Sequence, residues 1–360
     1  MARSRAAAVA EAVSSGSAAT AASSLKNEVT SALTTHGGAS AALSRSARRA
    51  RTQLPDPVRL ALVVVLSFTI TALGDSFVHF ATNGELGTIA RRPESKAEMG
   101  LLAAWKIFGL ALGWFGNFDG YDVAALAVLS SGPATYLATV FYGISASTTG
   151  AYLAVDVVSA LLPFVLLRQL SSAHAAAPNV PNREIVTDGG LQVLTSVLAG
   201  LVYSVVFFLA GRTFLPTALV LNFAGIPTIR PAADALLLGY DRPVTQVLSL
   251  VLGIAARTFI FTPMVTTPRN PEEEKEIADF DPAAATLGET VAYNLWGFTS
   301  QTKVSIKRTA VAMLYTAIGT YLQCASGIQG VESYGAAVYA SVWVVAAMVT
   351  GLSLRYVGSV

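Results

Sequence analysis

The fold is decided by residues 58–81, which read VRLALVVVLSFTITALGDSFVHFA. Between Arg59 and Asp75 this stretch carries no charged residue, whereas an amphipathic helix of a soluble protein would present a polar face along its whole length. About 20 consecutive apolar residues are needed for a helix to cross the hydrocarbon core of a bilayer. The stretch therefore predicts a transmembrane helix.

The rest of the chain repeats this pattern. Of the 360 residues, 53% are hydrophobic and 13% are charged, and this charged fraction is about half that of ordinary soluble domains. Outward from the first stretch, further apolar runs of spanning length lie at about 98–116, 121–142, 147–169, 190–211, 244–263, 307–328 and 334–354. We therefore predict an all-α fold, a polytopic transmembrane helix bundle of about eight spans formed by residues 54–360.

Residues 1–53 differ from the rest in composition. They are rich in Ala, Ser and Arg and hold few large apolar side chains, so they cannot bury enough surface to offset the entropy of ordering. We predict a disordered tail that ends in a basic cluster at Arg45, Arg48, Arg49 and Arg51. A cytosolic tail and an organelle transit peptide both fit this composition.

Lysines and arginines outside the predicted spans are distributed unevenly. Most lie on the side that both termini would share, with the largest numbers in the N-terminal segment and in the loop before residue 307. Because cytoplasmic loops carry an excess of Lys and Arg, we predict that both termini are cytoplasmic. The predicted location is the endoplasmic reticulum or another endomembrane, and the alternative is the mitochondrial inner membrane.

Four charged residues fall inside predicted spans: Asp75, Lys106, Asp156 and Arg257. Each would cost about 2.5–3.5 kcal/mol at the centre of a membrane helix, so each should face the bundle interior and have a partner. From their depths we predict that Lys106 pairs with Asp75 or Asp156 and that Arg257 shares Asp156. Two interpretations stay open: a neutralised set of charges that fixes helix packing, or a polar site at mid-membrane.

Small and capping residues indicate how some of the helices meet and begin. Gly109 and Gly113 form a small-xxx-small face, which predicts either close packing inside the bundle or dimerisation. Asp119 and Asp122 flank the start of the third span, where they are expected to cap the helix and interact with its dipole.

Residues 284–306 form an apolar and aromatic segment that does not span. Its apolar positions recur at helical spacing and basic residues follow, a pattern typical of a helix lying in the membrane interface. A connector that covers the end of the bundle is an equal alternative, and a protein partner at this loop is a further possibility. The residues concerned are Leu287, Val291, Leu295, Trp296, Phe298, Thr302 and Lys303.

Motifs of soluble enzymes are absent from the sequence. It contains no phosphate-binding glycine loop, no HExxH and no G-x-S-x-G elbow. The single cysteine, Cys324, excludes a disulfide within the chain, and His36, His79 and His174 are scattered among tail, span and loop. We predict no cofactor, no metal and no nucleic-acid partner, and the lipid bilayer as the main surroundings.

Three short motifs carry a family resemblance. They are Leu54-Pro55-Asp56-Pro57-Val58-Arg59, residues 112–122 (LGWFGNFDGYD), and Trp296-Gly297 with Lys303 downstream. On these the chain resembles a family of multi-spanning fungal membrane proteins of unknown activity. The resemblance covers residue 54 to the end and implies architecture, without a substrate.

The sequence leaves three function classes open. The leading prediction is a non-enzymatic organiser of partners or lipids in an internal membrane. It rests on the balanced intramembrane charges, the interfacial segment at residues 284–306 and the missing catalytic motifs. The alternative is a transporter or channel with a polar site formed by Asp75, Lys106, Asp156 and Arg257. The third is an intramembrane lipid-modifying enzyme.

Overall fold

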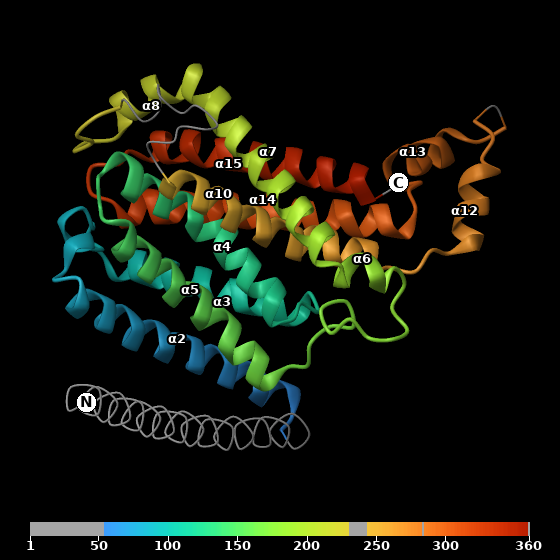
Figure 1. The fold of residues 1–360 in the computed structure, drawn as a ribbon, viewed down its shortest axis with the longest axis horizontal. Coiled ribbons are helices and arrows are strands. Elements are labelled where there is room, and N and C mark those ends of the chain that lie inside the picture. Colours follow the sequence, from blue (N-terminus) through green and yellow to red (C-terminus); the bar gives the residue numbers. More distant parts are fainter. Residues whose placement is uncertain (1–53, 230–242, 283, 359–360) are drawn as a thin grey trace, which may run out of the picture. The chain divides into compact units, whose positions relative to one another are not determined.

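The computed structural model describes residues 54–229, 243–282 and 284–358, and over these it contains helices and no strand (Figure 1). The predicted disordered tail, residues 1–53, lies outside the described residues. The elements are α2 (Asp56–Ala81), the 3₁₀ turn η1 (Glu85–Thr88), α3 (Lys96–Phe115), α4 (Gly120–Tyr136), the π-helix η2 (Leu137–Phe141), α5 (Ala146–Leu167), α6 (Arg183–Thr187), α7 (Gly189–Arg212), α8 (Leu215–Asn222), α10 (Pro243–Ala256), the π-helix η3 (Arg257–Phe261), α11 (Thr262–Val265), α12 (Pro271–Ala278), α13 (Leu287–Trp296), α14 (Ser300–Gly327) and α15 (Ser333–Gly358).

Seven of these helical segments are long and apolar enough to cross a membrane, counted over the described residues. They correspond to seven of the eight predicted spans, with ends that differ by a few residues. The outer faces of these helices expose large apolar side chains, such as Leu73, Phe77 and Phe80 on α2. A soluble protein rarely leaves so much contiguous apolar surface in water. The chain is therefore a multi-pass α-helical membrane protein, as predicted.

The remaining predicted span, 307–328, corresponds to α14, which is less apolar than the other seven. Its polar Thr316 and Thr320 are buried inside the bundle, so they lower the hydropathy of the helix without facing lipid. Asp56, where α2 begins, and Gly358, where α15 ends, lie at the same end of the bundle (Figure 1). The two ends of the described chain thus lie at one end of the bundle, as the eight predicted spans require.

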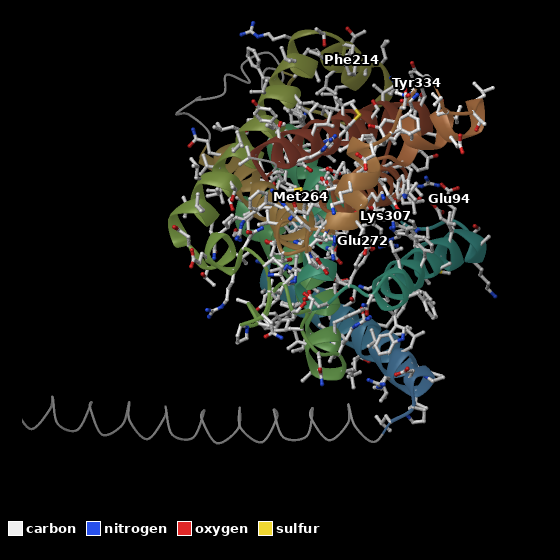
Figure 2. The ribbon with its side chains drawn as sticks, turned by 90° about the vertical axis from the view of Figure 1, so that its right-hand side faces the viewer. Glu94, Phe214, Met264, Glu272, Lys307 and Tyr334 are labelled. Atoms are coloured by element: carbon white, nitrogen blue, oxygen red, sulfur yellow. The ribbon has the colours of Figure 1, made fainter. Side chains whose placement is uncertain are left out.

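We name the two ends of the bundle by one residue each. The Asp56 end holds the start of α2, α4, α7 and α14, and the Glu85 end holds η1 and the start of α5 and α15 (Figure 1). Figure 2 faces the Asp56 end, where Met264, Glu272 and Lys307 are labelled. Helices α4, α10 and α15 form the buried centre, whereas α2 and α3 lie at the periphery.

Two prolines shape the central helices. Pro263 has no N–H and would clash with the carbonyl four residues earlier, so it leaves backbone carbonyls without an intrahelical partner. The helix ahead of it widens into the π-helix η3, in which Thr262 N–H bonds to the carbonyl of Arg257. The next two backbone carbonyls, those of Thr258 and Phe259, are free to accept hydrogen bonds from side chains. In α4 the order is reversed, because Pro133 comes before the π-helix η2.

The structure corrects the prediction for residues 284–306. The helical spacing suggested one helix through Thr302, but α13 ends at Trp296, and α14 begins at Ser300 with Thr299 as its N-cap. Gly297 separates the two helices. Lys303 therefore lies in the first turn of α14 and not in a loop.

Candidate functional site

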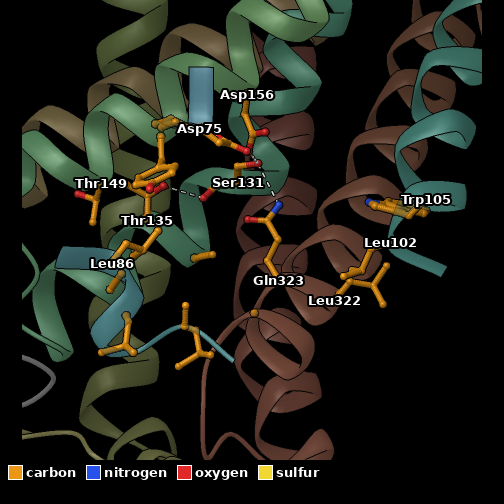
Figure 3. A pocket seen from close by; sticks show the side chains of 18 residues that line it. Asp75, Leu86, Leu102, Trp105, Ser131, Thr135, Thr149, Asp156, Leu322 and Gln323 are labelled. Atoms are coloured by element: carbon orange, nitrogen blue, oxygen red, sulfur yellow. Dashed lines mark hydrogen bonds between the residues drawn. The ribbon is translucent and has the colours of Figure 1, made fainter. Parts of the chain in front are cut away.

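A cavity of about 390 Å³ lies inside the bundle toward the Glu85 end (Figure 3). We call it the outer cavity. Side chains of α2, α3, α4, α5 and α14 line it, and most of its lining is apolar. Its volume falls in the range of small-molecule binding sites in proteins. Its polar side chains gather at its inner end, where Asp75, Ser131, Asp156 and Gln323 lie close to one another (Figure 3).

Asp156 is held in place by a short chain of hydrogen bonds. Ser131 Oγ donates to Asp156 Oδ2 at 3.0 Å, and Gln323 Nε2 donates to Ser131 Oγ at 2.9 Å (Figure 3). These hydrogen bonds connect α5, α4 and α14, so replacing any of the three side chains affects all three helices. Asp156 is thus a fixed part of the cavity wall.

Asp75 is placed differently, because it forms no hydrogen bond or ion pair with any residue that the structure describes. It lines the outer cavity, and its charge acts on Lys106 and Asp156. The aromatic side chains of Trp105 and Tyr152 line the same cavity. A carboxylate without a partner in an apolar cavity is available to bind a solute.

Lys106 belongs to a second, smaller cavity of about 120 Å³, which we call the inner cavity. It shares part of its lining, including Ser131 and Asp156, with the outer cavity. Lys106 Nζ donates to Ser159 Oγ at 3.2 Å and to Thr71 Oγ1.

A buried hydroxyl also faces the inner cavity. Ser67 lines it, is fully buried, and its Oγ has no hydrogen-bond partner in the structure. Ser67 thus adds a second polar group, beside Lys106, to the lining of the inner cavity.

The predicted ion pairs are not present among the described residues. Lys106 interacts electrostatically with Asp75 and Asp156, but its hydrogen bonds go to hydroxyl groups. Arg257 does not reach Asp156: it lies in η3, lines neither cavity, and its Nε has no partner. Only three of the four charges therefore meet. Depth along a helix does not determine which face of η3 carries Arg257, so this pairing could not be predicted from the sequence.

Two contacts hold the loop that covers the outer cavity. Glu85 accepts hydrogen bonds from Ser145 N–H at 2.7 Å and from the hydroxyls of Ser145 and Thr148, and these bonds hold the pKa of Glu85 below its usual value. A β-bridge joins Ala90 to Ile328 in the α14–α15 turn. Leu86 and Ile328 both line the cavity, so this loop forms its wall at the Glu85 end.

An ion-pair cluster occupies the opposite end of the bundle. His174 Nδ1 lies 2.7 Å from Asp119 Oδ2, and His174 Nε2 lies 3.2 Å from the carbonyl oxygen of Thr258. Both ring nitrogens face acceptors, an arrangement that favours the doubly protonated, positively charged form of the ring. Burial alone would lower the pKa of His174, but the bond to Asp119 and the charge of Asp122 outweigh it and raise the pKa.

Asp122 completes the cluster. It is fully buried, and Arg308 donates to its two carboxylate oxygens at 2.5 and 3.2 Å. Arg308 also donates to the carbonyl of Phe259 at 2.9 Å. Asp119 and Asp122 form a capping box at the start of α4, so the predicted capping is present. The backbone carbonyls of Thr258 and Phe259 in η3 thus accept hydrogen bonds from His174 and Arg308, the two cationic members of the cluster.

The cluster also meets the spacing of a metal site, because ligand atoms of Asp119, Asp122 and His174 lie within 4.8 Å of one another. Each of these groups already faces an opposite charge: His174 faces Asp119, and Arg308 faces Asp122 with a bidentate contact. Two acids and two bases leave the cluster neutral. This donor set fits a buried ion-pair network and not a cation site.

The two predicted packing glycines lie inside the bundle. A Cβ on Gly109 would lie 2.2 Å from Tyr315 Oη of α14, and one on Gly113 would lie 2.7 Å from Val123 Cγ2 of α4. Both positions therefore allow α3 to approach its neighbours within the chain.

Residues of the predicted interfacial segment are partly exposed. Leu287, Val291 and Trp296 of α13 present apolar surface, while Phe298 lies beneath the guanidinium group of Arg355. Lys303 forms an ion pair with Glu273 of α12. The side chain of Leu295 lies outside the described part of the structure.

Comparison with protein-family models, with curated proteins and with solved structures finds no match to this chain. The resemblance to fungal membrane proteins is therefore untested and stays a prediction. What the fold and the cavities define is a class: a multi-pass α-helical membrane protein with charged groups around cavities inside its bundle.

Sequence reasoning missed Gln323, Ser131 and Ser67 at the cavities. Each lies in an apolar span, where a serine or glutamine is tolerated for many reasons, so composition gave no signal. Gln323 is the exception in principle, because an amide of this size inside a span needs a partner within the bundle.

Proposed function

We propose that this chain is a membrane transport protein that takes a small, positively charged solute into the outer cavity, where Asp75 binds it. The supporting observation is the charge balance around the two adjoining cavities. By formal charge, Asp75 and Asp156 contribute two negative charges and Lys106 contributes one positive charge. In apolar surroundings an uncompensated charge is costly, so the site favours a monovalent cation.

The acidic residues have separate roles in this proposal. Asp156 is fixed by Ser131 and faces the charge of Lys106, so it serves as the internal counter-ion. Asp75 has no such partner and binds the solute. The aromatic ring of Tyr152 in the same lining suits an organic cation, because ring faces attract ammonium groups.

The position of the outer cavity in the bundle supports transport. The outer cavity lies toward the Glu85 end, while the cluster of Asp119, Asp122, His174 and Arg308 ties four segments together at the Asp56 end. A binding site inside the membrane that opens to one side at a time is the arrangement that alternating access requires. In this proposal the cluster holds the Asp56 end closed.

The organiser interpretation loses one of its three supports. The balance of two acids by two bases fails because Arg257 does not join the other three charges. An intramembrane lipid-modifying enzyme has no specific observation in its favour.

The membrane and orientation are proposals on the sequence evidence alone. We propose an endomembrane with the Asp56 end cytoplasmic, since basic residues such as Arg168, Lys303 and Arg355 lie at that end. The Glu85 end would then face the lumen. Imaging a tagged chain beside organelle markers tests the location.

The transport proposal is tested with the full chain reconstituted into liposomes. Methylammonium, ethanolamine and choline are added as probes, and the transient current across the membrane is recorded. We expect a saturable current for at least one of these amines and none for a neutral sugar. Replacing Asp75 by Asn should abolish the current, because the variant keeps the shape of the site and removes its unpartnered charge.

Asp279→Asn is the matched control, since Asp279 is an exposed residue at the end of α12 and lines neither cavity. Its current should equal that of the wild type. Equal currents in Asp75→Asn and the wild type would overturn the role of Asp75. Failure of all three amines to produce a current would overturn the proposed substrate class.

A further inference from the structure

A third pocket lies at the Asp56 end, away from both cavities. Its volume is about 300 Å³, and its lining includes Met264, Arg269, Glu274, Arg355 and Gly358. Met264 lies near the end of the span that finishes at Val265, and Gly358 is the last residue of α15. We call it the headgroup pocket, because the ends of the spans place it at the boundary between membrane and water.

The pocket carries more positive than negative charge. The guanidinium groups of Arg269 and Arg355 form no hydrogen bond and no ion pair with a described residue, although Arg355 lies 5.5 Å above the ring of Phe298. The carboxylate of Glu274 also has no partner in the described chain. The neighbouring Lys303 is neutralised by Glu273. One net positive charge remains in the lining.

We propose that the headgroup pocket binds the phosphate of a monoanionic phospholipid. Two arginines around one pocket match the geometry and charge of a phosphodiester, because guanidinium groups donate in pairs to phosphate oxygens. The single net positive charge complements a single negative charge. The position at the ends of two spans favours a lipid over a soluble phosphate compound, because basic pockets between membrane helices recognise lipid headgroups.

The test is native mass spectrometry of the full chain in detergent, titrated with phosphatidylglycerol and, separately, with phosphatidylcholine. We expect phosphatidylglycerol to bind more tightly. Arg269→Gln and Arg355→Gln should each weaken its binding roughly tenfold, since each removes charge-assisted hydrogen bonds. Arg355→Lys should recover part of the loss.

Arg212→Ala is the matched control, because Arg212 also lies over an aromatic ring, that of Phe208, but at the Glu85 end. It should bind phosphatidylglycerol as the wild type does. Arg269 is exposed in a loop, so Arg269→Gln tests the pocket even where an Arg355 variant fails to fold.

Equal binding of both lipids, or wild-type binding by Arg269→Gln, contradicts the proposal. The last experiment is a competition between inorganic phosphate and phosphatidylglycerol. If it displaces phosphatidylglycerol at matched concentration, the pocket recognises soluble phosphate compounds and the lipid assignment is wrong.

Discussion

Lys106 illustrates how a membrane protein holds a charge without an ion pair. Its ammonium group donates to two hydroxyls, those of Thr71 and Ser159, while the carboxylates of Asp75 and Asp156 act on it from beyond hydrogen-bond distance. The hydroxyl groups stabilise the ammonium group without neutralising its charge. The carboxylates of Asp75 and Asp156 can therefore still attract another cation, and the proposed binding site depends on this.

His174 makes the stability of the ion-pair cluster dependent on pH. Its pKa is raised above the usual value of 6.5 by Asp119 and Asp122, so the folded protein holds the proton more tightly than the unfolded chain. The stabilisation is therefore complete below about pH 6.5 and is lost as the pH rises through the raised pKa. We expect the thermal stability of the purified protein to fall over this range.

His174→Gln provides the comparison, because glutamine keeps hydrogen-bonding capacity and does not titrate. It should be less stable than the wild type at low pH, and the difference between the two should shrink as the pH rises. Thermal unfolding in detergent across the pH range measures both. A constant difference at every pH would show that the charge of His174 does not contribute.

Residues that act locally were predictable, and residues that act over long distances were not. The capping role of Asp119 and Asp122 follows from their position three residues apart at a helix start. Their partners His174 and Arg308 are far along the chain, and Arg308 is separated from Asp122 by 186 positions. Without the fold, no local pattern connects them.

At the scale of elements, the α7–α10 crossing depends on a glycine that the sequence analysis did not select. A Cβ on Gly253 would lie 2.2 Å from the carbonyl oxygen of Ser196 and 2.6 Å from the amide nitrogen of Gly200. Backbone atoms cannot move aside as a flexible side chain can. The two helices therefore approach closely because both carry small residues at the crossing.

Gly253→Ala should consequently lower the free energy of unfolding by roughly 1–3 kcal/mol, the cost of overpacking a well-packed interior. Gly150→Ala is the matched control, since a Cβ at Gly150 in α5 meets nothing within 4 Å. That control should stabilise the protein by about 0.5–1 kcal/mol through higher helix propensity. Chemical unfolding of both variants gives the comparison, and a tolerated Gly253→Ala would refute the tight crossing.

The elements themselves were largely predictable. Continuous apolar runs identify membrane helices because lipid requires apolar side chains on every exposed face. The start of α14 was missed, because the apolar run that predicts the span begins at about residue 307. In the structure the helix begins at Ser300, and the acids Glu273 and Asp122 stabilise the basic residues Lys303 and Arg308 near its start.

For the whole molecule, the sequence could not predict which intramembrane charges meet. It identified four, and the fold brings Asp75, Lys106 and Asp156 to adjoining cavities while Arg257 lies apart. This separation depends on how α10 and η3 rotate against α4 and α7, which is a property of packing. By formal charge, the set of residues at the cavities changes from neutral to negative, and the proposal of a transporter rests on this difference.

The central claim is a water-accessible, negatively charged cavity inside the bundle, and cysteine labelling tests it most directly. The chain has a single cysteine, Cys324, so Cys324→Ala gives a cysteine-free background. Thr135→Cys then places a thiol in the outer cavity, and Ser204→Cys places one between α7 and α10, outside the cavities. Modification by two methanethiosulfonates is measured, one with a trimethylammonium group and one with a sulfonate.

We predict that the cationic reagent modifies Thr135→Cys faster than the anionic one, that Asp75→Asn removes this preference, and that Ser204→Cys stays unmodified. An unreactive Thr135→Cys, or one that reacts equally with both reagents, would contradict the account.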